Sequence, residues 1–446
     1  MSGPAGEHAA ALAHRALDRT MARGMLVVAL FAAVTGVARV GQDAAIAWRF
    51  GTGPMVDAYY FLVNLAGWPL AVALSTLTML VAPTDAALRQ SDPRAAQQFR
   101  GELLGAVLLA ALLALPLAWW AMDAIAASPL GGLQRQAAAQ AVTGVPAIVM
   151  AVPLGFVGAL LTAWLVSAGR HLLTLLEALP ALVLIVVLLL APGPVLFWGT
   201  AVGVGLQLAA MALVLHLAHE LPRPRLGLSS AWSGFSRGAL VLLAGQMLFA
   251  LTPLVDLFFA ARLGEGAVAS LSFASRLVLG VQGLAGLALQ RAGLPLLSGL
   301  MVTAPAESRR VALRWAALAG GAGVLIGLLV AALADPLVSL LFERGRFTAT
   351  DREQVATMLR YGMLQMPPFL AGLALATALA SARAGGDLAL AGGVGLVVKL
   401  LLSVVLVTRL GVVGLMLATA LMYTATALTS WFALARHARS AQHLRP

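Results

Sequence analysis

The stretch Ala47-Trp48-Arg49-Phe50-Gly51-Thr52-Gly53 joins two long apolar runs, and its pattern returns half a chain later as Ala261-Arg262-Leu263-Gly264-Glu265-Gly266. The offset is constant, because 262 − 49, 264 − 51 and 266 − 53 all equal 213, and Ser270 falls at the place of Asp57. In both copies an arginine and two glycines predict a short turn between two membrane helices, with glycine where the backbone bends sharply. A repeat of this period predicts two related halves of one membrane bundle.

The composition is that of a membrane protein. Hydrophobic residues make up 61% of the chain and charged residues 11%, whereas a soluble domain carries about 25% charged residues. Apolar runs of about 20 residues recur along the whole length, which predicts an all-α polytopic membrane protein rather than a barrel of short alternating strands. The absence of cysteine excludes disulfides, thiolate metal ligands and cysteine nucleophiles.

We predict twelve membrane spans, arranged as two parallel six-helix lobes around a central cavity. The spans cover residues 24–48, 58–83, 101–122, 137–167, 172–191, 196–219, 239–263, 267–300, 311–334, 355–382, 388–408 and 412–435. The predicted organisation is a cytoplasmic tail (1–23), an N-lobe (24–219), a cytoplasmic linker (220–238), a C-lobe (239–435) and a second cytoplasmic tail (436–446). The longest polar connections, 84–100, 220–237 and 335–354, are too short for a separate catalytic domain.

The arginines of the connecting loops predict the orientation in the membrane. With the N-terminus inside, seventeen loop and tail arginines lie on the inner side and seven on the outer side. The positive-inside rule therefore places both termini in the cytoplasm. The net charge of +11 has the same origin. The phospholipid bilayer is thus a partner, and nucleic acid is not, since no patch combines aromatic and basic residues.

Several ionisable residues lie where lipid is expected. Arg39 sits deep in the first span, with Gln42 beside Asp43 one helical turn later. A charge at the centre of a membrane costs about 2.5 to 3.5 kcal/mol, so these side chains face either a cavity or a partner. Two interpretations stay open for Arg39 and Asp43, a purely structural ion pair and a lining of the cavity.

A second set of charges lies in the C-lobe. Arg276 in the eighth span has no acidic residue nearby in its own helix, so it either pairs across helices or binds an anion, for which arginine suits phosphate. Asp256 and Lys399, the single lysine of the chain, are proposed to pair between helices, either structurally or with the ammonium in the place of a coupling cation. His216 and His219 have no third ligand, so no metal site or other cofactor is predicted.

Several motifs resemble those of a known family. Residues 44–51 with Asp57-Ala58-Tyr59-Tyr60 are similar to the first hairpin of the MurJ/MviN lipid II flippases. Leu341-Phe342-Glu343-Arg344-Gly345-Arg346-Phe347-Thr348-Ala349-Thr350-Asp351 resembles the external loop before the tenth span of that family, and is the most specific match. Residues 158–164 resemble its fourth span, and Arg276 fits the arginine of its eighth.

The resemblance implies a member of the multidrug/oligosaccharidyl-lipid/polysaccharide exporter superfamily. Such a protein moves a lipid II-like peptidoglycan precursor, an undecaprenyl-pyrophosphate-linked oligosaccharide, between leaflets by alternating access. The substrate-binding residues would be Arg39, Gln42, Asp43 and Arg276, and the gate or coupling residues would be Arg49, Asp57, Asp256, Arg262, Glu265 and Lys399. A coupling cation (sodium or proton) and cell-wall synthesis proteins are the further partners that the family implies.

This sequence also departs from the family. In the first span, the family has Ser-Arg where this chain has Thr35-Gly36, and Arg-Asp where it has Gln42-Asp43. In the eighth span, an acidic residue of the family is replaced by Leu279. Two C-terminal spans of the family have no counterpart here. A polysaccharide or multidrug exporter of the same superfamily is the first alternative. A polytopic membrane enzyme or an assembly scaffold is the second, although nothing in the sequence arranges a nucleophile, a metal or a paired acid and base.

Overall fold

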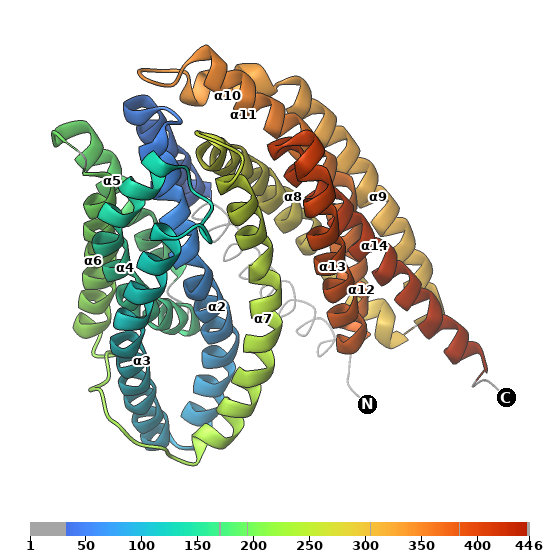
Figure 1. Cartoon of the computed structure of the whole chain (residues 1–446). Helices are drawn as coiled ribbons and strands as arrows, with labels where there is room; N and C mark the ends of the chain where they lie inside the picture. Colours follow the sequence, from blue (N-terminus) through green and yellow to red (C-terminus); the bar gives the residue numbers. More distant parts are fainter. Residues whose placement is uncertain (1–32, 169–170, 194, 304, 383, 444–446) are drawn as a thin grey trace, which may run out of the picture.

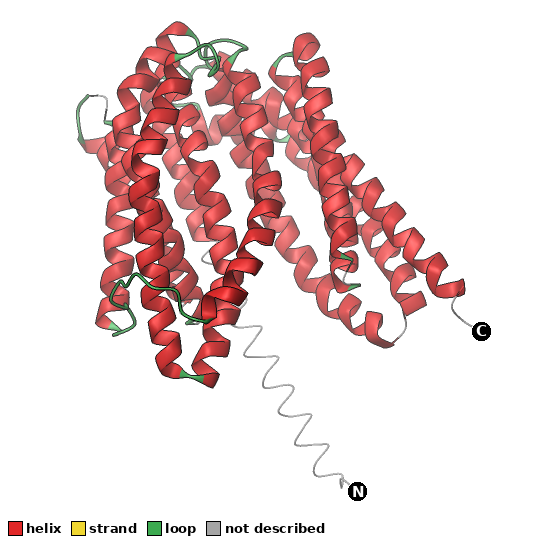
Figure 2. Cartoon of the chain, turned by 60° about the horizontal axis from the view of Figure 1, so that its bottom comes forward, coloured by secondary structure: helices red, strands yellow, loops and turns green. Residues whose placement is uncertain are grey.

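The protein is a bundle of long helices, and the described residues contain no strand (Figures 1 and 2). The structure, a computed structural model, describes residues 33–168, 171–193, 195–303, 305–382 and 384–443. The predicted tail 1–23 and the beginning of the first predicted span lie outside these residues. In the described residues, six α-helices and one 3-10 helix precede the linker and the remaining helices follow it, in agreement with the predicted two-lobe fold.

The N-lobe is built around α4. Its elements are a first helix (residues 33–50), α2 (Pro54–Ser91), α3 (Pro93–Ala127), α4 (Arg135–Ser167), the 3-10 helix η1 (His171–Ala178), α5 (Leu179–Leu190) and α6 (Leu196–Leu217). Helix α4 packs against α2, α3 and α6, and α5 packs against α6. More of α4 is buried than of its lobe neighbours, as expected for the centre of a bundle.

The C-lobe is built around α12. Its elements are α7 (Ala231–Ala261), α8 (Ala267–Thr303), α9 (Pro305–Ala332), α10 (Ala334–Phe342), α11 (Ala349–Gly362), η2 (Met363–Gln365), α12 (Met366–Ser381), α13 (Gly385–Leu410) and α14 (Val412–His443). Helix α12 packs against α8, α9 and α14, while α13 packs against α14. Helices α7 and α8 also contact α2, so they join the two lobes.

Each of the twelve predicted spans falls on a helical segment. Nine helices in the described residues are long and apolar enough to cross a membrane. The other three predicted spans correspond to the first helix, to α5 with η1 (shorter apolar helix Leu175–Leu190), and to α7, whose apolar part is Ala250–Ala261. The tenth span corresponds to α11 and α12 together with the 3-10 turn η2 between them.

All three predicted polar connections were wrong in detail, and the linker is shorter than predicted because α7 already begins at Ala231. Residues 84–100 are helical except at Asp92, whose carboxylate accepts hydrogen bonds from the backbone of Arg94 (2.9 Å) and Ala95 (3.2 Å) and so caps α3. The polar residues of this stretch show where α2 and α3 leave the apolar part of the membrane, and the helices themselves continue beyond that point. Likewise, residues 335–354 contain α10, and the predicted tail 436–446 begins as a continuation of α14.

The linker between the lobes is held against α3. The backbone N–H of Arg225 donates to the carbonyl of Gly101 (2.9 Å), and the carbonyl of Arg225 lies so close to Gly105 that a Cβ there would be 2.1 Å from it. Glu102 accepts hydrogen bonds from the backbone of Ser229 (3.0 Å) and the indole of Trp232 (2.9 Å). Two glycines one turn apart thus form the groove that seats the linker.

The two repeated turns meet at one end of the molecule, which we call the hairpin end. Gly51, Gly264 and Gly266 have φ values of 67°, 132° and 78°, as predicted for glycines at sharp bends. Gly53 is different, because it has φ −71° and serves as the N-cap of α2. Gly266 packs directly on Thr52, since a Cβ on the glycine would lie 3.0 Å from the threonine carbonyl.

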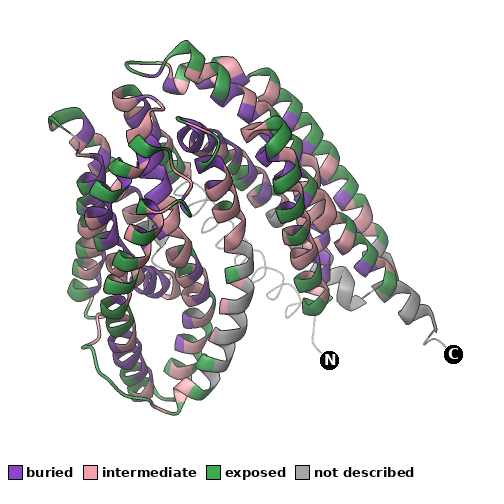
Figure 3. Ribbon diagram, viewed as in Figure 1, coloured by how far each residue is buried: buried purple, intermediate pink, exposed green. Residues whose placement is uncertain are grey.

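The buried residues run along the interior of each lobe, and the outward faces stay exposed (Figure 3). The exposed faces carry large apolar side chains, among them Leu112, Leu113, Leu325 and Leu329. Such a surface matches hydrocarbon rather than water. The chain is therefore a multi-pass membrane protein whose lobes pack inward on small and apolar residues.

We expect Arg100→Ala to destabilise the N-lobe strongly. Arg100 binds the carboxylate of Asp85 in a buried bidentate pair, with distances of 2.7 Å and 2.8 Å. Removal of Arg100 leaves the buried carboxylate with the half-exposed Arg89 as its remaining charged partner, and breaking a buried pair costs about 3 to 5 kcal/mol. Arg89 binds the same carboxylate at 3.0 Å but is half exposed, so Arg89→Ala should cost less than about 1 kcal/mol. Thermal unfolding in detergent measures both, and equal shifts would contradict this assignment.

Candidate functional site

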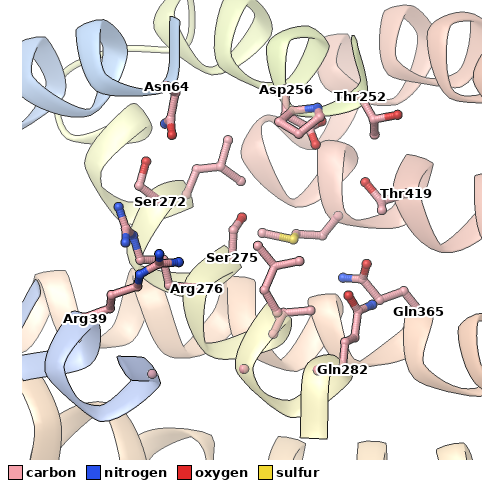
Figure 4. A pocket seen from close by; sticks show the side chains of 18 of the residues that line it. Arg39, Asn64, Thr252, Asp256, Ser272, Ser275, Arg276, Gln282, Gln365 and Thr419 are labelled. Atoms are coloured by element: carbon pink, nitrogen blue, oxygen red, sulfur yellow. The ribbon is translucent and has the colours of Figure 1, made fainter. Parts of the chain in front are cut away.

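A large cavity lies between the lobes. Its volume is about 1470 Å³, beyond the size of pockets for ordinary small ligands, which are about 300 to 1,000 Å³. The N-lobe contributes the first helix and Asn64 of α2, and the C-lobe contributes α7, α8, α13 and α14. Figure 4 shows Arg39 and Arg276 on one side of the cavity, and Asp256, Thr252 and Thr419 on the other.

Asp43 is the centre of a network that joins the lobes. Its carboxylate is fully buried and forms an ion pair with Arg276 of α8, at 3.2 Å between Oδ2 and Nε. The hydroxyl of Tyr60 donates to the other carboxylate oxygen (2.7 Å), and the guanidinium of Arg276 lies over the Tyr60 ring, 5.5 Å from its centre. Of the alternatives left open for Arg276, pairing across helices is therefore confirmed.

Arg39 lines the cavity, as one of its two interpretations predicts. It is exposed, and it interacts electrostatically with Arg276, Glu177 and Asp43. The ion pair of Asp43 is with Arg276 and not with Arg39, so a structural Arg39–Asp43 pair was the wrong interpretation. Figure 4 shows the two guanidinium groups next to each other at the cavity wall. This arrangement presents two forked donors to one guest, which suits an anion with several oxygens.

The predicted pair between Asp256 and Lys399 is present. The ammonium of Lys399 lies 2.5 Å from Oδ1 of Asp256 and joins α13 to α7. The ammonium also donates to the Thr419 hydroxyl (2.5 Å) and the Leu415 carbonyl (3.1 Å), both on α14. Lysine is fully buried here, whereas Asp256 lines the cavity.

The hairpin end is closed by Asp57. Its carboxylate, at the first turn of α2, accepts hydrogen bonds from the backbone N–H groups of Gly266 (2.6 Å) and Ala269 (2.8 Å). Gly266 immediately precedes α8 of the other lobe and Ala269 lies in its first turn, where N–H groups have no partner inside their own helix. The negative charge also interacts favourably with the N-terminal dipole of α8. Asp57 therefore caps a helix of the opposite lobe.

The loop that carries the most specific motif packs on the first hairpin. The backbone N–H of Arg346 donates to the carbonyl of Trp48 (2.9 Å). Gly345 has φ 63°, and a Cβ on it would lie 2.2 Å from the same carbonyl. A Cβ on Gly51 would meet the carbonyl of Arg346 at 2.8 Å. Both glycines are thus required where the two segments touch, which gives a physical reason for the glycines of both motifs.

The same loop is fixed on its other side. Thr348 and Asp351 form a capping box at the start of α11, and the hydroxyl of Thr52 donates to Asp351 across the lobes. Arg352 pairs with Glu343 at 3.0 Å. The pKa of Glu343 is lowered mainly by a hydrogen bond from the Ser339 hydroxyl and to a smaller extent by one from Arg352. The stabilisation of the loop by the ionised Glu343 carboxylate is therefore complete at neutral pH and is lost on acidification.

The other residues selected from the sequence have different places. Arg49 donates to the carbonyls of Leu188 (2.6 Å) and Gly193 (2.8 Å), so it holds the end of α5 inside its own lobe. The stem of Arg262 packs on Gly132 of the N-lobe, and Glu265 is exposed near Asp57.

Gln42 does not line the cavity, contrary to the role given to it from the sequence. Its amide donates to the Tyr59 hydroxyl (3.2 Å), which shares a hydrogen bond with Thr200 inside the N-lobe. Consecutive side chains on a helix point in directions about 100° apart. For this reason Gln42 points into the N-lobe although its neighbour Asp43 reaches Arg276 of the C-lobe. Sequence reasoning also missed the roles of Tyr60 and Thr419. Tyr60 belongs to the motif of the first hairpin, but the sequence does not show that its hydroxyl contacts Asp43.

Comparison with known proteins gives a consistent result. The family model of the lipid II flippase MurJ matches residues 46–444. The probable lipid II flippase MurJ of Bdellovibrio bacteriovorus is 32% identical over 177 residues, which are 38% of this chain and 32% of that protein. This match therefore spans about a third of the length of the curated relative.

Several solved structures share the fold, among them the following two. The lipid II flippase MurJ in an inward closed conformation superposes with a TM-score of 0.75 at 13% identity, over 92% of this chain and 87% of that one. An inward-facing multidrug resistance MATE family transporter of the MOP superfamily gives 0.74 at 13% identity, over 92% and 96%. The helical lobes and the cavity between them thus define a two-lobe membrane transporter fold. Within this class, the chain belongs to the MurJ family.

We expect Asp57→Ala to open the hairpin end. Loss of two charge-assisted hydrogen bonds, each worth about 1.5 to 3 kcal/mol, should raise the population of open molecules at least about tenfold. Ser270 is fully buried at this junction and the chain has no cysteine, so Ser270→Cys provides a unique reporter. Its maleimide labelling rate should rise in the Asp57→Ala background.

Glu353→Ala is the matched control, since it removes an exposed carboxylate of α11 from the same end of the molecule. Its labelling rate should equal that of the parent. Unchanged labelling in Asp57→Ala would show that other contacts hold this end closed.

Proposed function

We propose that this protein is a flippase that moves an undecaprenyl-pyrophosphate-linked oligosaccharide, a lipid II-like peptidoglycan precursor, from the inner to the outer leaflet. The observation that carries the proposal is the placement of Arg39 and Arg276 together in a large cavity between two lobes. Family membership and the shared fold support the same function.

The chemistry of the substrate explains why arginines are needed. A pyrophosphate carries two negative charges, and hydrocarbon cannot replace the water around them. Two guanidinium groups at one cavity wall offer several N–H donors in planar forks, which match phosphate oxygens. The volume of about 1470 Å³ leaves room for sugars beside the pyrophosphate.

Asp43 acts as the internal counter-ion of the empty site. Its ion pair with Arg276 keeps a buried positive charge compensated when no substrate is present. An arriving pyrophosphate competes with Asp43 for the guanidinium, while Tyr60 keeps a hydrogen bond to the carboxylate. Substrate binding is thereby linked to an ion pair that joins the first helix to α8.

Alternating access then requires the hairpin end to open. In the proposed orientation the termini and the linker face the cytoplasm, and the hairpin end faces the outside of a bacterial inner membrane. The lobes, residues 24–219 and 239–435, rock about the cavity as the contacts of Asp57, Trp48 and Thr52 with the C-lobe break. Arg262 and Glu265 lie in the turn that separates. A coupling cation and cell-wall synthesis proteins complete the proposed set of partners, and no catalytic step is part of this function.

A second candidate is export of a soluble or polymeric substrate. The favouring observation is the similar TM-score to the MATE transporter structure. In that case, vesicles containing the protein would show cation-driven efflux of a dye and no movement of polyprenyl lipid. The two arginines at the cavity wall favour an anionic guest instead, because a cationic substrate would place like charges next to Arg39.

We expect Arg39→Ala to reduce flipping in reconstituted vesicles. The change removes a charge-assisted contact worth about 1.5 to 3 kcal/mol, so the apparent affinity should fall roughly 10- to 100-fold. Transbilayer movement of a fluorescent undecaprenyl-pyrophosphate-linked sugar, measured by its accessibility to a membrane-impermeant reductant, gives the rate. Arg39 is preferred over Arg276 because its removal leaves the pair of Asp43 intact.

Arg409→Ala serves as the control, since this arginine is exposed at the end of α13 and does not line the cavity. It should flip lipid at the parental rate. Full activity of Arg39→Ala over a range of substrate concentrations would contradict the assignment of the cavity as the pyrophosphate site.

A further inference from the structure

Lys399 occupies an unusual position for a lysine. It is the single lysine of the chain, and its side chain is fully buried in the C-lobe. Lysine is almost never fully buried unless it is paired, and inside a membrane such a residue is a candidate for function. Its environment therefore needs an explanation beyond packing.

The ammonium lies in a cage of oxygen atoms. A carboxylate oxygen of Asp256 is 2.5 Å away, the hydroxyl of Thr419 is 2.5 Å away, and the carbonyl of Leu415 is 3.1 Å away. Carboxylate, hydroxyl and carbonyl oxygens are the ligands that hard cations such as Ca²⁺ and Mg²⁺ use in proteins. The cage would suit a small metal cation as well as it suits an ammonium.

Two further features indicate that the cage is built and not accidental. Gly395 lies one turn before Lys399 on α13, and a Cβ there would come within 2.3 Å of the Thr426 hydroxyl. This glycine lets α13 approach α14 closely enough for the ammonium to reach Leu415 and Thr419. The hydroxyl of Ser403, one turn after Lys399, is buried and has no hydrogen-bond partner among the described residues.

The cage also borders the cavity. Asp256 and Thr419 both line it, and Thr252 lies one turn before Asp256 on the same face of α7. A mobile cation at this place would reach its ligands from the cavity, and its binding would respond to whether the cavity is open. An ammonium attached to α13 cannot leave in this way.

We propose that the Lys399 ammonium is a tethered cation that permanently fills an alkali-metal site formed by Asp256, Thr419 and the Leu415 carbonyl. Removal of the lysine side chain converts this site into one that binds sodium. In the parent protein no sodium ion binds or leaves here during the transport cycle. This inference deepens the proposed function, because it concerns the coupling cation, but the site itself does not depend on the identity of the transported lipid.

The alternative is an ion pair that only holds α7 against α13. Both interpretations predict that loss of Lys399 destabilises the protein, since Asp256 then lacks its counter-charge. They differ in what restores stability. A tethered cation can be replaced by a free one that enters the vacated space, whereas a structural lysine can be replaced only by another side chain.

The test measures thermal unfolding of purified protein in detergent, in sodium chloride and in choline chloride at equal ionic strength. Lys399→Ala should be less stable than the parent in choline, and sodium should raise its unfolding midpoint by about 2 to 4 °C through preferential binding to the folded state. The parent should unfold at the same temperature in both salts, because its site is already filled.

Lys399→Met is the matched control. Methionine removes the charge but fills most of the space of the lysine stem, so Lys399→Met should be destabilised without a response specific to sodium. Thr419→Val or Asp256→Asn, each combined with Lys399→Ala, should remove the sodium response, because each eliminates a ligand of the site.

Each outcome decides the proposal. A sodium response of the parent, or equal midpoints of Lys399→Ala in the two salts, would overturn it. If Lys399→Ala folds only when it is expressed and purified in sodium, the proposal is supported, and if it is unfolded in every salt the proposal fails. The assay contains no lipid substrate, so its failure leaves the pyrophosphate site untouched, and failure of the flipping test leaves the cation site untouched.

Discussion

Hydrocarbon cannot solvate a charge, and this constraint accounts for the positions of the ionisable side chains in this bundle. Asp43 is paired with Arg276, Asp85 with Arg100, and Asp256 with Lys399. The three pairs have different structural roles. The pair of Asp85 lies within one lobe beside the linker end, the pair of Asp256 lies within the other lobe, and the pair of Asp43 alone among them joins the lobes through the cavity wall.

The internal repeat is the origin of the hairpin end, but its two copies have become unequal. Asp57 caps α8, whereas Ser270, at the equivalent place, has a buried hydroxyl without a hydrogen-bond partner among the described residues. The N-lobe therefore supplies the charged cap to the C-lobe and receives none in return. In place of a reciprocal cap, the loop of Gly345 and Arg346 closes over Trp48.

The sequence was sufficient for the architecture and for the charged residues inside apolar spans, because both follow from the cost of placing polar groups in lipid. The buried pair of Asp85 and Arg100 was missed, since both residues lie in a stretch that was expected to be a polar connection. Runs of apolar residues located the helices, and Asp256 and Lys399 stood out as a pair because each is a charged residue inside an apolar span. Contacts between helices were harder. Arg39 and Asp43 looked like a pair at one-turn spacing, yet the nearer ion pair of Asp43 is with α8. Local spacing cannot reveal which helix lies opposite, and the ends of α2 and α3 were missed because polar residues continue a helix beyond the membrane.

The cavity itself has two chemically distinct sides, and their separation restricts how cation and anion sites can be coupled. Arg39 and Arg276 lie on the side of the first helix and α8, whereas Asp256 and Thr419 lie on the side of α7 and α14. An anion that bound both arginines would contact both lobes, because Arg39 belongs to the first helix and Arg276 belongs to α8. The Lys399 cage contacts the C-lobe alone. Binding of an anion at the arginine side can therefore change the position of one lobe relative to the other directly. The Lys399 cage can affect the lobes only through the conformation of the C-lobe. There the permanently attached ammonium holds α7 against α13 and α14.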